Sequence, residues 1–505
     1  MISRLSKNII YNLFGRGLVL IIGFVAVKYI FNRLGADALG IIYFTAVINT
    51  ILSAVLEMGV SATTVREISA HFGLDSKYIK DLIRTFSFFY WSIYALAAVV
   101  IFFLAPVIVE RWINISTMSP ATVIHILRVL GITSILALPK SFYGNLLCGL
   151  QRMEFTNFID VITIGLQQFG VVFILAFWGG LFPVIYWFAA TYILRVIIYF
   201  FVSAHFFTFS ALIPGFSFAV IQRNLKFALR TTLISIISTI HTQADKLIIS
   251  KLLPIGTMGY YSVAYSSVSQ GNLLTNAISQ AAYPSFSALF KTENKDSLLS
   301  QYRKLQDLVC FSILPIFAAI SFALIPLFSY LLNEKIAYLL LLPTTFLCFG
   351  FFMNGTLAIP YIVSLAVGKP EITVKMNFYA LFVVLPVTVI LIYFFGLIGA
   401  GLSWVFYNIF AYFYGVPRIC KECIGIKVRD WYFHIFKIII LAVLTYGVSW
   451  FVLETIGALS IIPLVLAYLV ASIIFIISSY FMIGKELRET LSNYLRFILR
   501  IKILK

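Results

Sequence analysis

Seven basic side chains lie inside stretches of the sequence that are otherwise apolar enough to cross a membrane. They are Arg16, Lys28, Arg128, Lys140, Arg195, Lys246 and Lys437. A cation in the hydrocarbon core costs at least about 3 kcal/mol, so such residues normally face a hydrated cavity or a group of opposite charge. Acids at comparable depth are fewer, and Asp160 and Asp245 are the clearest of them. This excess of positive charge predicts that the protein holds an anion within the membrane.

Four of these cations are the candidates for an anion site. Arg16, Arg128, Lys140 and Arg195 lie far from the ends of their apolar stretches and belong to the first half of the chain. The alternative for each is an ion pair or packing between helices, whereas Lys28 lies near a helix end and can extend to the interface. Guanidinium groups bind phosphate oxygens in bidentate geometry. We therefore expect the four side chains to converge on a water-filled cavity suited to a pyrophosphate.

A dense run of polar residues marks a second candidate surface. Gln270, Asn272 and Gln280 lie in an otherwise membrane-spanning stretch, where Gln270 and Gln280 share much of one helix face and Asn272 lies to one side. These residues are predicted to line a hydrated cavity of the size of a sugar. The alternative is that they form hydrogen bonds between packed helices.

Asp245 is the candidate ion-coupling residue. A carboxylate within the membrane can bind a proton or a sodium ion, and the alternative is a structural ion pair with a cation on another helix. Adjacent residues on a helix point about 100° apart, so we expect that Asp245 and Lys246 do not simply neutralise each other.

Composition defines the class of protein. Sixty-one per cent of the 505 residues are hydrophobic, 11% are charged, and the mean hydropathy is +1.01. These values predict an all-α polytopic membrane protein. At about 20 apolar residues per span, fourteen transmembrane helices are expected, over approximately 8–31, 38–60, 85–109, 121–147, 155–178, 182–207, 228–252, 257–284, 308–332, 336–363, 374–395, 397–417, 431–453 and 460–483.

The distribution of charge predicts the orientation. The net charge of +18 lies in loops on one side of the predicted spans, whereas connectors on the other side are short and nearly uncharged. Basic loops remain cytoplasmic, so both termini are predicted to be cytoplasmic, and nucleic acid is not an expected partner. The first apolar stretch lacks a cleavage signal and is expected to be a membrane span.

An internal repeat suggests two lobes. A shift of 219 residues superimposes Gly40 on Gly259, Gly131 on Gly350, Gly149 on Gly368 and Gly180 on Gly399. Spans 1–6 thereby match spans 7–12, a design in which transporters hold substrate between two halves. We predict an N-lobe over residues 1–210, a cytoplasmic linker over 211–230, a C-lobe over 231–420, and two added helices with a basic cytoplasmic tail over 421–505.

Several functions have no signature in the sequence. A nucleotide-binding Gly-x4-Gly-Lys-Ser/Thr motif is absent, as is the Asp-x-Asp motif of metal-dependent sugar transferases. Cys420 and Cys423 form a lone CxxC pair, for which two reduced thiols are a better interpretation than a metal site. We therefore predict no catalytic residues, no metal and no cofactor, with a coupling proton or sodium ion as the only expected small ion.

Particular segments resemble a known family. Asn32 to Tyr43, Glu57 to Gly59 followed by Arg66, Leu147 to Arg152, Ala244 to Ala264, and the turn around Gly368 resemble segments of the Wzx-type O-antigen and exopolysaccharide flippases. Those flippases belong to the multidrug/oligosaccharidyl-lipid/polysaccharide (MOP) exporter superfamily. The resemblance covers residues 8–420. It implies two six-helix lobes and a location in the bacterial inner (plasma) membrane. It also implies translocation of an undecaprenyl-pyrophosphate-linked oligosaccharide across that membrane by alternating access, with polymerase and chain-length proteins as further partners.

Three alternatives stay open at this point. A lipid II flippase of the same superfamily also has fourteen spans. A drug exporter would have an acidic cavity and no added helices, and a membrane glycan polymerase or ligase would need a large outer loop. The excess of intramembrane bases and the short outer loops favour the oligosaccharide flippase.

The last two predicted spans, 431–453 and 460–483, are expected to have a role of their own. A polyprenyl tail stays in lipid while its head group crosses, because exposing each CH₂ group to water costs about 0.8 kcal/mol. The added helices are expected to wall an apolar groove for this tail, with Lys437 near its cytoplasmic end; a dimer contact is the alternative. The wall residues are Leu441, Ala442, Leu444, Leu464, Leu466 and Ala467.

Overall fold

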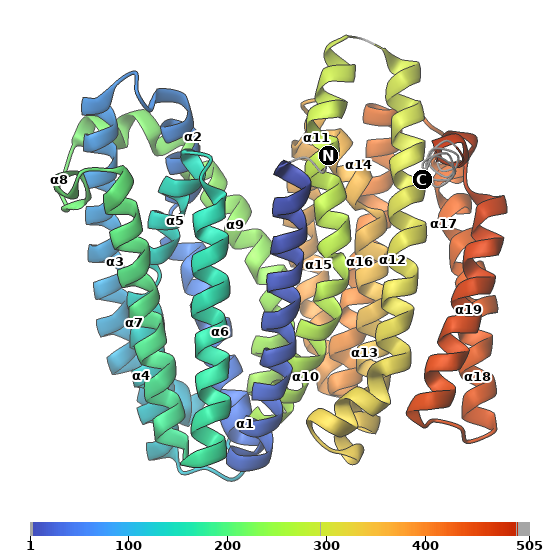
Figure 1. Cartoon of the computed structure of the whole chain (residues 1–505), viewed down its shortest axis with the longest axis horizontal. Helices are drawn as coiled ribbons and strands as arrows, with labels where there is room; N and C mark the ends of the chain where they lie inside the picture. Colours follow the sequence, from blue (N-terminus) through green and yellow to red (C-terminus); the bar gives the residue numbers. More distant parts are fainter. Residues whose placement is uncertain (1–3, 293, 491, 493–505) are drawn as a thin grey trace, which may run out of the picture. The chain divides into compact units, whose positions relative to one another are not determined.

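The computed structural model describes residues 4–292, 294–490 and 492, with side chains from residue 17 onward except for residue 18. Within these ranges every regular element is a helix and no strand occurs, which confirms the predicted all-α class (Figure 1). The chain divides into two compact units, and the boundary falls between Ser262 and Val263.

The first unit is built from nine helices of the described chain and the beginning of a tenth. Their bounds are α1 Arg4–Leu56, α2 Val60–His71, α3 Ser76–Arg111, α4 Pro120–Leu136, α5 Pro139–Gly149, α6 Met153–Phe177, α7 Leu181–Phe206, α8 Phe209–Leu212, α9 Phe218–Leu252 and α10 Ile255–Ser269. The unit boundary falls inside α10. Residues 218–230 of the predicted linker form the first turns of α9.

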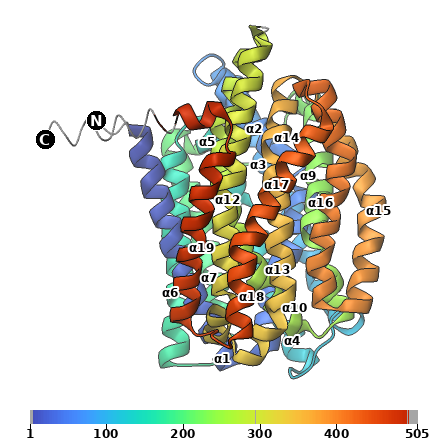
Figure 2. The same ribbon diagram turned by 90° about the vertical axis from the view of Figure 1, so that its right-hand side faces the viewer.

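The second unit contains the remaining described helices. Their bounds are η1 Gln270–Asn272, α11 Leu273–Lys291, α12 Lys295–Leu331, α13 Glu334–Thr356, α14 Ala358–Ala366, α15 Glu371–Phe395, α16 Leu397–Ile419, η2 Cys420–Ile424, α17 Val428–Ala442, η3 Val443–Gly447, α18 Val448–Thr455 and α19 Ile461–Met482. Figure 2 shows α17, α18 and α19 beside α12. Asn294 and Asn333 cap α12 and α13 by accepting hydrogen bonds from backbone N–H groups.

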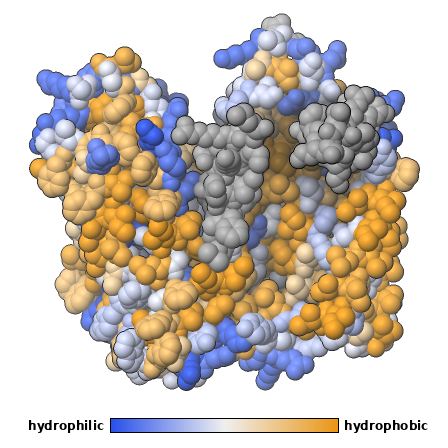
Figure 3. Space-filling model, viewed as in Figure 1, coloured by the Kyte–Doolittle hydropathy of each residue, from blue (hydrophilic) through white to orange (hydrophobic). Residues whose placement is uncertain are grey.

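The helices are those of a multi-pass membrane protein. Eleven helices of the described residues are long and apolar enough to cross a membrane. One of them, α1, consists of two helices that meet at a kink at Gly35, where φ is 86°. Neither α9 nor α10 meets the same length and hydropathy criteria, so fourteen spans stay a prediction. Each unit carries a broad apolar surface between hydrophilic ends (Figure 3).

Interrupted helices repeat along the chain. The break between α4 and α5 includes Leu138, and the break between α13 and α14 is at Leu357, 219 residues later. The kink at Gly35 likewise corresponds to Pro254, which lies between α9 and α10. The glycine repeat in the sequence therefore coincides with a repeat of helix interruptions.

Candidate functional site

Two of the four predicted anion-binding cations lie close together in the first unit. The break in the fourth span ends at Pro139, the first residue of α5, so Lys140 lies in the first turn of that helix. Arg195 projects from α7 and is 6% exposed. Lys140 lies within electrostatic range of both Arg195 and Asp160 of α6. Arg195 and Lys140 therefore share one polar cluster with the carboxylate of Asp160.

Hydrogen bonds orient this cluster from the neighbouring helix. Arg195 Nε donates to Thr163 Oγ1 of α6 at 2.8 Å. The Tyr199 hydroxyl donates to Asp160 Oδ1 at 3.0 Å. Arg195 Nη2 is buried and has no hydrogen-bond partner among the described residues. A buried polar group without a partner is costly, so this guanidinium edge is suited to an acceptor such as a phosphate oxygen.

Arg128 does not join Lys140 and Arg195. Its guanidinium lies 4.3 Å from the ring centroid of Phe102 on α3, and its Nε donates to the Phe102 carbonyl at 3.1 Å. Phe102 is 42% exposed, so this contact is at the outside of the helices. The side chain of Arg16 lies outside the described residues. Lys437 is exposed and lies over the Phe433 ring.

The polar run of the second unit divides between two faces. Gln270 and Gln280 are exposed, as a cavity-lining role requires. Asn272 is partly buried, and its Oδ1 has no hydrogen-bond partner among the described residues. Thr275 Oγ1 and Ser279 Oγ, on the same side of α11, are also buried without partners there. Asn272 therefore belongs to an unsatisfied polar face, separate from that of the two glutamines.

Asp245 and Lys246 pair with each other, contrary to the expectation from helix geometry. Asp245 is 2% exposed, and Lys246 Nζ lies 3.2 Å from its Oδ1. The expectation was wrong because the long lysine side chain curls back along the helix, where its Nζ also donates to the Thr242 carbonyl. The Tyr261 hydroxyl donates to Asp245 Oδ2 at 2.7 Å. Ion coupling at Asp245 stays a prediction. The coupling ion would have to bind a carboxylate that is already paired with Lys246.

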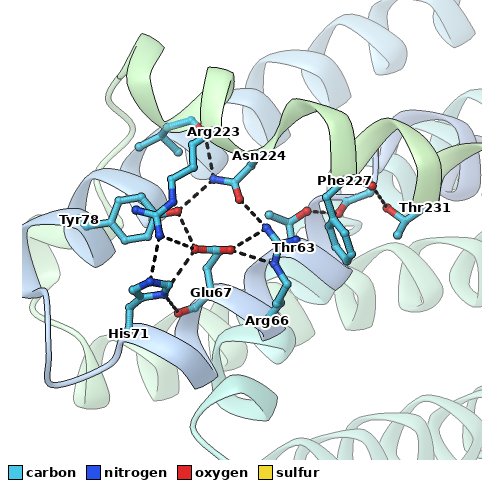
Figure 4. A network of polar contacts seen from close by, with 11 residues as sticks. Thr63, Arg66, Glu67, His71, Tyr78, Arg223, Asn224, Phe227 and Thr231 are labelled. Carbon is cyan, nitrogen blue, oxygen red and sulfur yellow. Dashed lines mark hydrogen bonds and ion pairs between the residues drawn. The ribbon is translucent and has the colours of Figure 1, made fainter. Parts of the chain in front are cut away.

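A network around Glu67 joins α2, α3 and α9 (Figure 4). Glu67 is 5% exposed, and its carboxylate accepts hydrogen bonds from the Tyr78 hydroxyl at 2.8 Å and from Arg66 Nε at 2.9 Å. Arg223 Nη2 of α9 lies 3.7 Å from Glu67 Oε2 and 2.9 Å from Nε2 of His71. Two arginines and a tyrosine thus surround one buried acid.

Asn224 completes the connection between α9 and the other two helices. It accepts a hydrogen bond from Arg66 Nη2 at 2.9 Å and donates one to the Tyr78 hydroxyl at 3.0 Å. The Arg66 guanidinium also lies 3.9 Å from the centroid of the Phe227 ring. These contacts fasten the beginning of α9 to α2 and α3.

The other end of α9 is fastened to the loop between α3 and α4. Trp112 Nε1 donates to Ser250 Oγ at 3.1 Å, and the backbone N–H of Ile255 donates to the Asn114 carbonyl at 2.8 Å. Asp37 of α1 holds the same loop, because its Oδ2 accepts the backbone N–H groups of Ser116 at 3.0 Å and Thr117 at 2.6 Å. Within the first unit, α9 is therefore tied at both ends.

Sequence reasoning missed the Glu67 network because its partners come from segments more than 150 residues apart. One local signal was present. Glu67 lies one helical turn after Thr63 and Thr64 and next to Ile68, all of which are buried on α2. An acid on the buried face of an amphipathic helix predicts partners from neighbouring elements.

The fold defines the class of protein. A MATE-family multidrug transporter of the MOP superfamily, in its inward-facing conformation, matches with a TM-score of 0.66 and 15% identity, over 80% of this chain and 94% of that one. The lipid II flippase MurJ, in an inward closed conformation, matches with a TM-score of 0.67 and 16% identity, over 92% of this chain and 98% of that one. The protein therefore has the fold of MOP-superfamily transporters.

The sequence defines the family within this class. Residues 5–290 match the family model described as "Polysaccharide biosynthesis protein", and the chain belongs to that family. A curated relative named "Putative O-antigen transporter" from Shigella flexneri is 23% identical over 409 residues, which are 79% of this chain and 93% of the relative. These matches confirm the family resemblance that the sequence motifs indicated.

Proposed function

We propose that this protein flips an oligosaccharide linked to undecaprenyl pyrophosphate across the bacterial plasma membrane by alternating access. The observation that carries the proposal is the cluster of Lys140 and Arg195, in which both cations lie within electrostatic range of one carboxylate, Asp160. The cluster has one excess positive charge and a buried guanidinium edge without a partner among the described residues. A pyrophosphate supplies both the negative charge and the hydrogen-bond acceptors that this arrangement lacks.

The sugars would meet a different surface. The exposed amides of Gln270 and Gln280 offer donors and acceptors of the kind that bind hydroxyl groups. Such contacts are individually weak and distributed, which suits a carrier that must release its cargo.

The polyprenyl tail would stay among apolar helices. A cavity of about 220 Å³ lies between α12, α13 and α17, and Phe317, Phe349, Ala442 and Val443 contribute to its lining. Of the predicted wall residues, Leu441 and Leu464 are buried, whereas Leu444 and Leu466 are exposed. The cavity supports a tail-binding role for the added helices while the charged head group crosses.

Flipping reconstituted in vesicles tests the proposal. Full-length protein in proteoliposomes would be given a fluorescent lipid-linked oligosaccharide whose exposure on each side is read by a membrane-impermeant quencher. Lys140→Gln combined with Arg195→Gln is expected to abolish flipping while leaving the amount of reconstituted protein unchanged. Arg128→Gln is the matched control, because Arg128 contacts Phe102 and not the cluster. Wild-type flipping by the double variant would overturn the proposal.

The lipid substrate is tested in the same assay. Lipid II offered beside an O-antigen-type lipid-linked oligosaccharide separates the two flippase functions, because both carry the pyrophosphate and differ in the attached glycan. We expect the O-antigen-type substrate to cross faster. Faster flipping of lipid II would favour the alternative function.

A further inference from the structure

A polar cavity of about 240 Å³ lies in the second unit, apart from the candidate transport residues. It is bounded by α12, by the beginning of α17 and by the segment after α19. Its lining residues are Tyr302, Arg303, Gln306, Asp307, Ile426, Asp430, Trp431, His434, Met482, Gly484 and Glu486.

Asp307 holds the three elements around this cavity together. Its Oδ2 accepts the backbone N–H of Gly484 at 2.6 Å, and its Oδ1 lies 3.0 Å from Nε2 of His434. Asp307 is 5% exposed. Since Oδ2 is hydrogen-bonded and Oδ1 lies beside the His434 ring, Asp307 shapes the cavity and leaves other groups to bind a ligand.

Three almost fully buried side chains of the lining have polar atoms that no group outside the three satisfies. Tyr302 and Trp431 are each 2% exposed and Gln306 is 3% exposed. Gln306 Oε1 makes no hydrogen bond within the described part of the chain, and the Tyr302 hydroxyl and Trp431 Nε1 have no partner there other than each other. Buried polar groups normally have partners. The cavity therefore presents one free donor, the Tyr302 O–H, and one acceptor, Gln306 Oε1, to an occupant.

Charges of both signs surround these polar atoms. Glu486 and Asp430 contribute carboxylates, and Arg303 contributes a guanidinium. Arg303 and Glu486 are only loosely paired, with 3.8 Å between Nη1 and Oε1. A ligand with separate cationic and anionic groups would match this arrangement better than one of a single sign.

The position of the cavity along its helices corresponds to the level of lipid head groups. Its residues on α12 directly precede the predicted apolar span 308–332, and those on α17 lie at the beginning of the span 431–453. Met482 and Glu486 lie at the end of the span 460–483. Phe433 and Phe436 of α17 and Phe481 of α19 are 58%, 58% and 73% exposed, as expected of side chains that face lipid.

We propose that this cavity binds the head group of a phospholipid with a primary amine, of the phosphatidylethanolamine type. The phosphate accepts hydrogen bonds from Tyr302 and Arg303, and the ammonium donates to Gln306 and to the carboxylates of Glu486 and Asp430. The volume lies just below the range of about 300–1,000 Å³ for small-molecule sites, so it holds a head group while the acyl chains remain in the bilayer. Binding of this head group would be a further role of the second unit, in addition to the proposed flipping.

Native mass spectrometry of the full-length protein tests this site. Detergent-solubilised protein would be equilibrated with equal amounts of phosphatidylethanolamine, phosphatidylglycerol and phosphatidylcholine. Phosphatidylethanolamine is expected to be retained preferentially, because the choline group has no N–H donor and glycerol has no positive charge. Equal retention of the three lipids would overturn the proposal.

Two conservative variants locate the binding. Tyr302→Phe removes one hydroxyl, and Glu486→Gln removes one charge from a partly exposed side chain. Each is expected to lower phosphatidylethanolamine retention about five- to tenfold, the factor for one lost hydrogen bond of ordinary strength. Tyr393→Phe is the matched control, because Tyr393 is 71% exposed on α15. Unchanged retention in both variants would contradict the assignment.

A soluble competitor identifies the source of the ligand. Glycerophosphoethanolamine carries the same phosphate and amine without acyl chains. A lipid site predicts that the soluble compound displaces the lipid only at large excess. If it binds as tightly as the lipid, the cavity takes a soluble phosphoamine and the lipid assignment is wrong.

Discussion

Gly40 and Gly259 lie back to back. They are partners in the 219-residue repeat, and a Cβ atom on Gly259 would lie 2.8 Å from the backbone nitrogen of Gly40. A Cβ atom on Gly40 would lie 2.1 Å from the carbonyl oxygen of Ile255, the repeat partner of Ala36. Residues related by a two-fold axis contact each other in this reciprocal way. Within the first unit, the crossing of α1 and α10 is therefore a close contact between matching positions of the repeat.

The first prediction concerns this crossing. Gly40→Ala is expected to lower the apparent unfolding temperature of the purified protein, since an added methyl group in a close backbone contact costs about 1–3 kcal/mol. Gly165→Ala is the control, because nothing lies within 4 Å of a Cβ atom at Gly165. Equal unfolding temperatures of the two variants would show that α1 and α10 can move apart at the crossing without loss of stability.

A second prediction concerns the beginning of α9. Glu67→Gln removes the charge that Arg66 and Arg223 surround, and the lost charge-assisted hydrogen bonds should cost about 1–3 kcal/mol. Hydrogen–deuterium exchange of residues 218–231 should therefore become faster. Glu154→Gln serves as the control, because the Arg152–Glu154 pair is about half exposed on both sides. If hydrogen–deuterium exchange is unchanged after Glu67→Gln, the Glu67 network does not hold the beginning of α9 to α2 and α3.

The third prediction is that neutralising the acid and neutralising a base of the Lys140–Arg195–Asp160 cluster change the affinity for pyrophosphate in opposite directions. Asp160→Asn should increase the affinity of the purified protein for pyrophosphate, because it neutralises the carboxylate of the cluster while the amide oxygen of the new side chain can still accept from Tyr199. Arg195→Gln should decrease it. At an effective dielectric constant of about 20, a nearby unit charge contributes on the order of 1 kcal/mol or more, or roughly fivefold. Calorimetry at low salt measures both, and changes of the same sign would contradict the arrangement.

A fourth prediction separates structure from ion coupling at Asp245. Asp245→Asn takes the carboxylate from buried Lys246, and breaking such a pair costs up to about 3–5 kcal/mol, so poor folding is expected. Asp245→Asn combined with Lys246→Met should restore the amount of folded protein in the membrane. The double variant then tests coupling: a normal response of transport to proton and sodium gradients would exclude Asp245 as the coupling site.

The fifth prediction concerns topology. Reporter fusions after Gly180 and after Lys295 should report the periplasm and the cytoplasm, respectively, because basic loops remain inside. The reverse pattern would invert the predicted orientation of the whole chain.

The sequence predicted helices far better than it predicted partners. Hydropathy and turn residues are local, so the predicted spans 182–207 and 397–417 begin within one residue of the observed starts of α7 and α16, Leu181 and Leu397. Arg195 and Lys140 could be chosen from depth alone, because a buried cation is conspicuous in an apolar stretch. The direction of a side chain is not local: Arg128 turns to Phe102, and Lys246 returns to Asp245.

The length of α12 has a practical consequence for imaging. Thirty-seven residues make a helix of about 55 Å, whereas the hydrocarbon core is about 30 Å thick. Several turns near Lys295 therefore extend past the bilayer as a continuous helix. A rigid protein fused in helical register at this end would give a small transporter the external mass that particle alignment in electron microscopy requires.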